Sequence, residues 1–289
     1  MEQPLVVAIT GAGSGIGLRA TARLTARGHT VLALVRDPAR AQPAIAGATA
    51  ATPGSVEIVR ADLSDPTSVR EAAEHITARG RLDALINNAA VFDQTQRTPL
   101  FTEAGHELVW ATNHLGPWEL TARLSPALAR APKPRVVFVA SKGLITMPRI
   151  AIRWDALDSP DWYTPVRAYY HAKLAQVMTA QSLADRAGDA VDVTCIRVPA
   201  VRLDADRLAA MPAVLRFLYA PKNAAAAPPE QLAETYADAV QRWEPSSHPY
   251  VDEKLARVAL PRFAADPANR DRLWQLTAAA VGNPVWAWA

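Results

Sequence analysis

Short, continuous apolar runs alternate with longer amphipathic segments along this chain. The apolar runs are Leu5–Ile9, Val31–Val35, Val56–Val59, Leu82–Ile86, Val136–Val139 and Val191–Ile196. Continuous rather than alternating hydrophobicity is typical of strands that are buried on both faces of a parallel sheet. The pattern therefore predicts six buried parallel strands.

The segments between these runs carry apolar side chains at helical spacing. The predicted helices are Ile16–Ala26, Ser68–Ala78, Leu115–Ala129, Ala168–Arg186, Gln231–Trp243 and Pro267–Val281. Strand and helix in alternation, joined by right-handed crossovers, predict an α/β doubly wound Rossmann fold around a central parallel sheet. The run Ala224–Pro229 is too short for a domain linker and is expected to be a loop. We therefore predict a single domain over residues 1–289, with a cofactor half of about 1–140 and a catalytic and substrate half of about 141–289.

Composition narrows the class of protein. Half of the 289 residues are hydrophobic, which supports a large core and excludes a disordered chain. Lys plus Arg exceed Asp plus Glu by 31 − 28 = 3, too few to predict a nucleic-acid partner. The one cysteine, Cys195, cannot form an internal disulfide and favours a reducing compartment. No apolar run approaches the ~20 residues of a membrane span, so a cytoplasmic protein without a membrane partner is expected.

A glycine-rich segment follows the first predicted strand and opens the first helix. Thr10–Gly17 fits T-G-x-x-x-G-x-G through Gly11, Gly15 and Gly17, whereas the strict G-x-G-x-x-G spacing would place its third glycine on Ile16. Glycines there let the backbone turn tightly and approach a pyrophosphate, whose charge lies at the helix N-terminus. The alternative is a glycine-rich turn without a ligand, and the strand–helix context favours a dinucleotide.

The end of the second strand indicates which nicotinamide cofactor is preferred. An acidic residue there would bind the ribose 2′-hydroxyl of NAD, but the sequence has Arg36, which can bind a 2′-phosphate through its guanidinium group. Asp37 could bind a hydroxyl or pair with Arg40. We therefore expect NADPH (NADP) to be preferred, with NAD possible; a solvated Arg-Asp turn is the alternative.

A tyrosine and a lysine stand four residues apart in a predicted helix. Tyr169 and Lys173 share one helix face, whereas Tyr170 has Leu174 at the same offset. An ammonium beside a phenol stabilises the phenolate, so we expect Lys173 to lower the pKa of Tyr169 and suit it to acid–base catalysis. On its own such a pair is more often a solvated helix face.

Together these residues resemble the short-chain dehydrogenase/reductase family. The matching motifs are Thr10–Gly17, Asp62-Leu63, Asn87-Asn88-Ala89-Ala90, Asn113, Ser141 and Tyr169/Lys173, in the family's order over about the first 200 residues. Asn113–Gly116, Tyr169–Ala175, His248–Asp252 and Arg272–Trp274 are similar to the retinol-dehydrogenase-like branch.

The resemblance implies a role for each catalytic position. Tyr169 would protonate a carbonyl oxygen as hydride arrives, or deprotonate the alcohol in reverse. Lys173 would lower the tyrosine pKa and hold ribose hydroxyls, and Ser141 would hydrogen-bond the substrate oxygen. Asn113 would fix a water that connects Lys173 to solvent. Taken singly, Asn113 could instead be a helix cap and Ser141 a strand-end turn.

The resemblance also implies a set of cofactor-binding residues. Asp62 and Leu63 would contact the adenine and Asn88 the adenosine-side ribose, although Asp62 could instead cap the next helix. The full set is Gly11, Ser14, Gly15, Ile16, Gly17, Arg36, Asp62, Leu63, Asn88, Tyr169, Lys173 and Val201. The six histidines show no metal-ligand spacing, so no metal is predicted.

Several positions depart from the family pattern. Ala90 and Ala200 stand where the family usually has glycine, Ala140 stands where it has serine, and an expected threonine is missing near Leu203 and Asp204. Added methyl groups would crowd the nicotinamide. A non-redox cyclase or dehydratase that uses Tyr169 and Lys173 for proton transfer is therefore the alternative function, and a cofactor-sensing protein without catalysis is a third.

Two apolar segments bear on the substrate. The connection between Ser141 and Tyr169 carries Ile145, Met147, Ile150, Ile152, Trp154, Trp162 and Tyr163, and Leu208–Tyr219 lies where the family places its substrate lid. Such side chains predict a bulky apolar small-molecule substrate, unless they only pack the insert onto the core. Arg19, Arg23 and Arg27 are expected to form a solvated helix face.

The sequence thus predicts an NADPH-dependent oxidoreductase that reduces a ketone or aldehyde, or oxidises the alcohol, on a bulky apolar molecule. Alanine- and arginine-rich composition suggests a bacterial genome rich in G and C, and by association secondary metabolism. A homodimer or homotetramer is the expected assembly.

Overall fold

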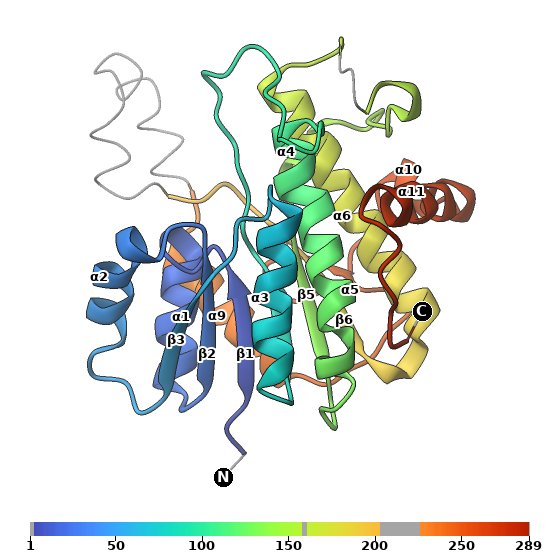
Figure 1. Ribbon diagram of the computed structural model, residues 1–289. Coiled ribbons are helices and arrows are strands. Elements are labelled where there is room, and N and C mark those ends of the chain that lie inside the picture. The colour runs from blue at the N-terminus through green and yellow to red at the C-terminus, as the bar shows by residue number, and fades with distance from the viewer. Residues whose placement is uncertain (1–2, 158–160, 203–225, 289) are drawn as a thin grey trace.

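A seven-stranded parallel sheet forms the centre of the computed structural model, which describes residues 3–157, 161–202 and 226–288 (Figure 1). The strands are β1 (Val6–Thr10), β2 (Thr30–Val35), β3 (Ser55–Arg60), β4 (Ala84–Asn87), β5 (Arg135–Ser141), β6 (Asp192–Val198) and β7 (Tyr250–Val251). Their spatial order is β3-β2-β1-β4-β5-β6-β7, and every pairing is parallel. The six predicted strands and the doubly wound fold are confirmed; the two-residue β7 was not predicted.

Helices cover both faces of this sheet. The principal helices are α1 (Gly15–Ala26), α2 (Pro38–Thr49), α3 (Pro66–Ala78), α5 (Gly116–Leu128), α6 (Pro165–Ala187), α9 (Pro229–Gln241) and α11 (Pro267–Ala280). One apolar cluster joins the sheet to α3, α5 and α6, and a second joins the opposite face to α1, α2 and α9. The continuous apolar runs of the strands are explained by these two clusters, because each strand has a buried face on both sides.

The strand order reverses between β1 and β4, which are neighbours at the centre of the sheet. Open α/β sheets bind ligands outside the carboxyl ends of the strands at such a switch point. The Thr10 hydroxyl ties the two strand ends together, because it accepts hydrogen bonds from the backbone N–H groups of Asn88 (3.0 Å) and Ala89 (2.9 Å). The glycine loop and the residues after β4 are therefore held beside each other.

The helix that leads into α5 contains a widened turn. It begins at α4 (Leu108–Trp110), passes through a π-helical turn (Ala111–Leu115) and continues as α5. The Gly116 N–H donates to the Ala111 carbonyl five residues earlier. Such turns are rare and occur frequently at functional sites, and this one contains Asn113.

The three arginines of α1 form ion pairs, so the expected solvated face is wrong. Arg19 contacts Glu230 (2.5 Å) and Arg23 contacts Glu234 (2.5 Å) on α9. Arg27 contacts Glu234 and, at 2.8 Å, Asp238. The partners come from a helix more than 200 positions later in the chain, which periodicity within α1 could not reveal.

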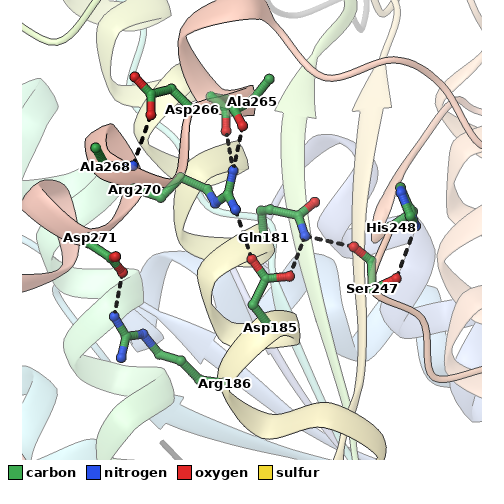
Figure 2. Close-up of polar contacts among 11 residues, drawn as sticks. Gln181, Asp185, Arg186, Ser247, His248, Ala265, Asp266, Ala268, Arg270 and Asp271 are labelled. Atoms are coloured by element: carbon green, nitrogen blue, oxygen red, sulfur yellow. Dashed lines mark hydrogen bonds and ion pairs between the residues drawn. The ribbon is translucent and has the colours of Figure 1, made fainter.

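The C-terminal helices pack against α6. Figure 2 shows Arg270 bonded to Asp185 (3.0 Å) and to the Ala265 carbonyl (2.9 Å), and Arg186 bonded to Asp271 (2.9 Å). In the same network, the Gln181 amide donates to Asp185 and to the Ser247 carbonyl. These bonds connect the second half of α6 to α10 (Arg262–Ala265), α11 and the segment before β7.

Trp286 continues this packing beyond α11, with its ring 4.9 Å from that of Trp118 on α5. No helix in the described part of the chain is both long and apolar enough to span a bilayer. The predicted lid, Leu208–Tyr219, and the departures at Leu203 and Asp204 lie outside the described residues.

The first residue of α5 provides a test of the packing between α5 and the turn after β3. A Cβ on Gly116 would lie 2.1 Å from the Leu63 carbonyl oxygen, whereas a Cβ on Gly47 in α2 meets nothing within 4 Å. Gly116→Ala should lower the free energy of unfolding by about 1–3 kcal/mol, the typical cost of overpacking. Gly47→Ala should raise it by up to about 1 kcal/mol. Urea unfolding of both variants measures this, and equal stabilities would contradict the close approach.

Candidate active site

A pocket of about 320 Å³ opens at the carboxyl ends of the central strands. Among the residues that line it are Gly11, Ser14, Gly15, Ile16, Gly17, Asn88, Tyr169, Lys173 and Val201, all of them predicted cofactor-binding positions. The pocket brings together segments from β1 to the end of β6, as parallel strands with a common edge require. Within the described ranges, its lining includes two cationic residues, Lys173 and Arg202, and no carboxylate.

The glycine loop fits a dinucleotide. Gly11 and Gly15 have φ values of +69° and +57°, a region that favours glycine. A Cβ on Gly17 would lie 2.2 Å from the Gly11 carbonyl oxygen, so only glycine allows α1 to start this close to β1. The N-terminus of α1, which has no acidic residue in its first turn, therefore faces the pocket as an anion site.

Arg36, at the end of β2, lies outside this pocket lining. Its side chain is exposed and, within the described residues, forms no ion pair. Asp37 accepts a hydrogen bond from the Arg40 backbone N–H (3.1 Å) and caps α2. The Asp37 carboxylate is thus engaged with the backbone rather than paired with the Arg40 side chain, and Arg36 is the group available for a phosphate.

The predicted adenine contacts follow β3, beside the end of β2. The Asp62 carboxylate accepts hydrogen bonds from the backbone N–H (2.9 Å) and hydroxyl (2.6 Å) of Ser64, and Asp65 is the residue that caps α3. Leu63 is buried against Gly116. Neither Asp62 nor Leu63 lines the pocket around Tyr169, so both contacts stay predictions.

Lys173 is a buried cation. Its ammonium group donates to the Val139 carbonyl (2.6 Å) and to Gln176 Oε1 (2.8 Å), and the side chain is 1% exposed. Burial lowers the pKa of Lys173 to about 8, although the neighbouring Cys195 acts in the opposite direction. The lysine therefore keeps its charge at neutral pH and loses it only slightly above.

Tyr169 lies within reach of this cation. The Lys173 Nζ is 5.7 Å from the centre of the Tyr169 ring, and Phe92 stacks on the ring at 4.4 Å. Burial raises the pKa of Tyr169 to about 12; the neighbouring Tyr170 adds to this and a hydrogen bond with Ser141 opposes it. The net pKa of Tyr169 is therefore raised and not lowered as expected, because burial outweighs the effect of an ammonium group whose hydrogen bonds go to Val139 and Gln176.

Ser141 ends β5 beside Tyr169. Its hydroxyl oxygen accepts a hydrogen bond from the Gly143 N–H (3.2 Å) and takes part in the contact with Tyr169. The strand-end turn is present, and the hydrogen bond from Ser141 to a substrate oxygen stays a prediction. Ser141 and Tyr169 can thus meet at one substrate oxygen.

Asn113 holds the segment after β4. Its side-chain oxygen accepts from the Val91 N–H (2.7 Å), and its amide donates to the Val91 carbonyl (2.9 Å). The side chain is fully buried and does not cap a helix. Asn113 therefore fixes the backbone next to Phe92, which stacks on Tyr169; the bridging water stays a prediction.

Positions that depart from the family pattern lie partly in the pocket. Ala90 and Ala140 line it, whereas Ala200 does not. Ala90 is exposed and Ala140 is buried in the core.

Two side chains of the site were missed from the sequence. Gln176 is buried, and its Nε2 has no hydrogen-bond partner in the described structure. Its position three residues after Lys173 could have indicated the contact, since both lie on one helix face. Tyr236 of α9 also lines the pocket with a buried, unpartnered hydroxyl, which no local pattern signals.

The insert between Ser141 and Tyr169 packs largely onto the rest of the protein. Ile152 is buried in the core, and Trp154 lies 5.9 Å from Phe263 of α10. Trp162 lies 4.7 Å from His171 of α6. None of these residues lines the pocket around Tyr169, so packing accounts for this part of the apolar insert.

Comparison with known proteins places these features in one family. The family model described as short chain dehydrogenase matches residues 5–151. Retinol dehydrogenase 12 of Homo sapiens is 32% identical over 282 residues, which cover 96% of this chain and 86% of that protein.

Further similarity is found in sequence and in structure. Protochlorophyllide reductase of Chlamydomonas reinhardtii is 36% identical over 217 residues; the match covers 67% of this chain and about half (54%) of that relative. An uncharacterized protein from Mycobacterium paratuberculosis has a TM-score of 0.72 at 26% identity, over 97% of this chain and 96% of its own. Other structures with the same fold hold NADP or NADPH, at TM-scores of 0.62 to 0.65.

The buried ammonium predicts a pH-dependent stability. Its pKa of about 8 lies below the ordinary value of 10.5. Between these values the folded protein binds fewer protons at Lys173 than the unfolded chain, so the burial penalty declines as pH rises. Relative to Lys173→Met, the wild-type free energy of unfolding should gain about 2 kcal/mol between roughly pH 7 and 9.5. Urea unfolding across this range measures the difference, and parallel curves would show that Lys173 titrates normally.

Proposed function

The chain belongs to the short-chain dehydrogenase/reductase family, in its retinol-dehydrogenase-like branch, and on this basis we propose that it is an NADPH-dependent reductase of ketones or aldehydes on bulky, mostly apolar molecules. Membership makes it a NAD(P)-dependent oxidoreductase. The observation that carries the proposal is the meeting of Tyr169, Ser141 and the buried Lys173 at one pocket edge.

A bound nicotinamide dinucleotide supplies the hydride that reduces the carbonyl carbon. The Tyr169 hydroxyl gives its proton to the carbonyl oxygen, which becomes the alcohol, and the Ser141 hydroxyl donates a hydrogen bond to the same oxygen. The transfer leaves a phenolate whose ring centre lies 5.7 Å from the Lys173 cation, and the attraction between these charges acts against the burial that raises the Tyr169 pKa.

The protonation states favour reduction. With the pKa of Tyr169 raised to about 12, the phenol holds its proton at neutral pH and is ready to donate it. Lys173 remains charged below a pH of about 8. Oxidation of an alcohol would instead require Tyr169 to lose its proton first, which burial opposes.

The preference for NADPH rests on Arg36 and Asp37. The exposed Arg36 guanidinium can bind a 2′-phosphate, and the Asp37 carboxylate that could serve a 2′-hydroxyl is occupied as a helix cap. NAD remains the alternative cofactor.

An apolar substrate is supported by Phe92, which is 42% exposed and stacks on Tyr169. The relatives point the same way, since retinol and protochlorophyllide are the molecules in their names. All-trans-retinal is therefore a reasonable first test substrate. We extend the proposal to a cytoplasmic homo-oligomer with a role in bacterial secondary metabolism, for which the support is composition and family.

Tyr169→Phe tests the chemistry. Removal of the proton donor should lower kcat for NADPH-dependent reduction by about 10²–10⁴-fold, while NADPH affinity stays nearly unchanged. The matched control is Tyr170→Phe, which removes the neighbouring phenol hydroxyl and should retain most of the activity. Loss of NADPH absorbance with retinal as substrate measures the rate, and tryptophan fluorescence measures affinity.

The product distinguishes the two candidate chemistries. Mass spectrometry should find a gain of two hydrogens in the product. Unaltered turnover in Tyr169→Phe would contradict the role of the tyrosine. An isomer or a product that has lost water would favour the non-redox cyclase or dehydratase.

Arg36→Gln tests the cofactor preference. Loss of a charged hydrogen bond to phosphate should weaken NADPH binding by about 10-fold or more and leave NADH binding unchanged. Arg257→Gln, at another exposed arginine, serves as the control. Equal weakening of both nucleotides, or of neither, would rule out Arg36 as the residue that selects NADPH.

A further inference from the structure

A second, larger cavity lies on the other side of α6. Its volume is about 880 Å³, and it is lined by Met147, Pro148, Arg149, Ile150, Ala151, Arg153, Trp162, Arg167, His171 and Arg262. Arg167 and His171 stand two residues before and after Tyr169, which is roughly 200° around the helix. The cavity therefore opens on the face of α6 that is turned away from the catalytic tyrosine.

Three separate segments of the chain build this cavity. The connection after β5 supplies Met147 to Arg153, the first turns of α6 supply Arg167 and His171, and α10 supplies Arg262. Figure 1 shows α10 beside α6, and the two helices are in contact. A ligand here would hold together the segments that flank Ser141 and Tyr169.

The charge of the cavity is one-sided. Of the residues that the structure describes, four arginines line it and no carboxylate does. All four side chains are exposed, and among the described residues none of them forms an ion pair. Other arginines in the C-terminal half of the chain do form ion pairs. Arg186 contacts Asp271, and Arg270 contacts Asp185.

Two other cavities of the protein do not share this imbalance. The cavity beside β6 and β7 places Asp192 and Glu244 among its arginines, and a third places Asp83 beside Arg81. The pocket that fits the dinucleotide does share it, with Lys173 and Arg202 and no acid. Clefts lined by one sign of charge concentrate ligands of the opposite sign.

Between the arginines the wall is apolar and aromatic. Met147 and Ile150 contribute apolar side chains, and the Trp162 ring lies 4.7 Å from His171. The His171 Nε2 accepts a hydrogen bond from the Arg153 backbone N–H (3.0 Å), so the buried ring adds no charge to the wall. A guanidinium group binds a carboxylate or phosphate in a fork, and the apolar wall suits a hydrocarbon body.

We propose that this cavity is a binding site, separate from the redox site, for an organic anion with a carboxylate or phosphate head group and an apolar body. The head group contacts the four arginines of the lining. The apolar body lies against Met147, Ile150 and Trp162. The proposal goes beyond the reductase activity and does not require it.

Isothermal titration calorimetry tests the site with three probes below their micellar concentrations. Decanoate and decyl phosphate carry the two anionic head groups, and decyl maltoside carries the same chain without charge. The wild-type protein should bind at least one anion and bind decyl maltoside much more weakly. Comparison of the affinities for decanoate and decyl phosphate shows whether a carboxylate or a phosphate head group is preferred.

Variants locate the binding. Arg153→Gln/Arg167→Gln should weaken anion binding by at least about tenfold, because charged hydrogen bonds are lost, whereas Arg257→Gln should leave it unchanged. Tyr169→Phe should also leave it unchanged, which separates this site from the proposed reduction. Equal affinity in the double variant, or no anion binding by the wild type, would overturn the proposal.

A lipid surface is the competing source of anionic head groups. Sedimentation with phosphatidylglycerol vesicles and with phosphatidylcholine vesicles distinguishes it. Arginine-dependent capture by phosphatidylglycerol vesicles without binding of any monomeric anion would overturn the small-molecule site in favour of a membrane contact.

Discussion

The burial of one lysine ammonium at the carboxyl edge of the sheet is the constraint on which the active site depends. Lys173 is 1% exposed and is held by the Val139 carbonyl and the Gln176 side chain. Removing an ammonium from water is unfavourable unless it is hydrogen-bonded, so the end of β5 and two turns of α6 must be placed with precision. The same placement puts Tyr169 one turn before the cation and Ser141 at the end of β5, within hydrogen-bonding contact of Tyr169, as the proposed reduction requires.

The sheet supplies that placement. Two apolar clusters cover its faces and fix α6 against β5 and β6, and the pocket opens at the carboxyl ends of the strands. Thr10 joins β1 to β4 at the switch point, and Asn113 holds Val91 so that Phe92 stacks on the catalytic ring. The core thus carries the Tyr169 phenol, the Ser141 hydroxyl and the Lys173 cation on one edge, with the glycine loop beside them.

Sequence patterns predicted the elements whose signal is local. The strands were found because each is buried on two sides, and the glycine loop because its backbone geometry admits only glycine. Long-range features were missed or misjudged. The α1 arginines pair with α9 across more than 200 positions, and the two residues of β7 are strand only because β6 lies beside them. The raised pKa of Tyr169 could not be foreseen, since it comes from burial by distant segments rather than from Lys173.

The pKa of Lys173 is the quantity that tests this account most directly. The chain has five lysines, so lysine-selective ¹³C labelling gives a simple NMR spectrum in which Lys173→Met identifies the resonance. Titration of the folded protein should show a pKa near 8 for the Lys173 resonance, well below the ordinary 10.5. An ordinary pKa for Lys173 would mean that its ammonium is solvated, and would contradict the buried cation on which the proposed proton transfer rests.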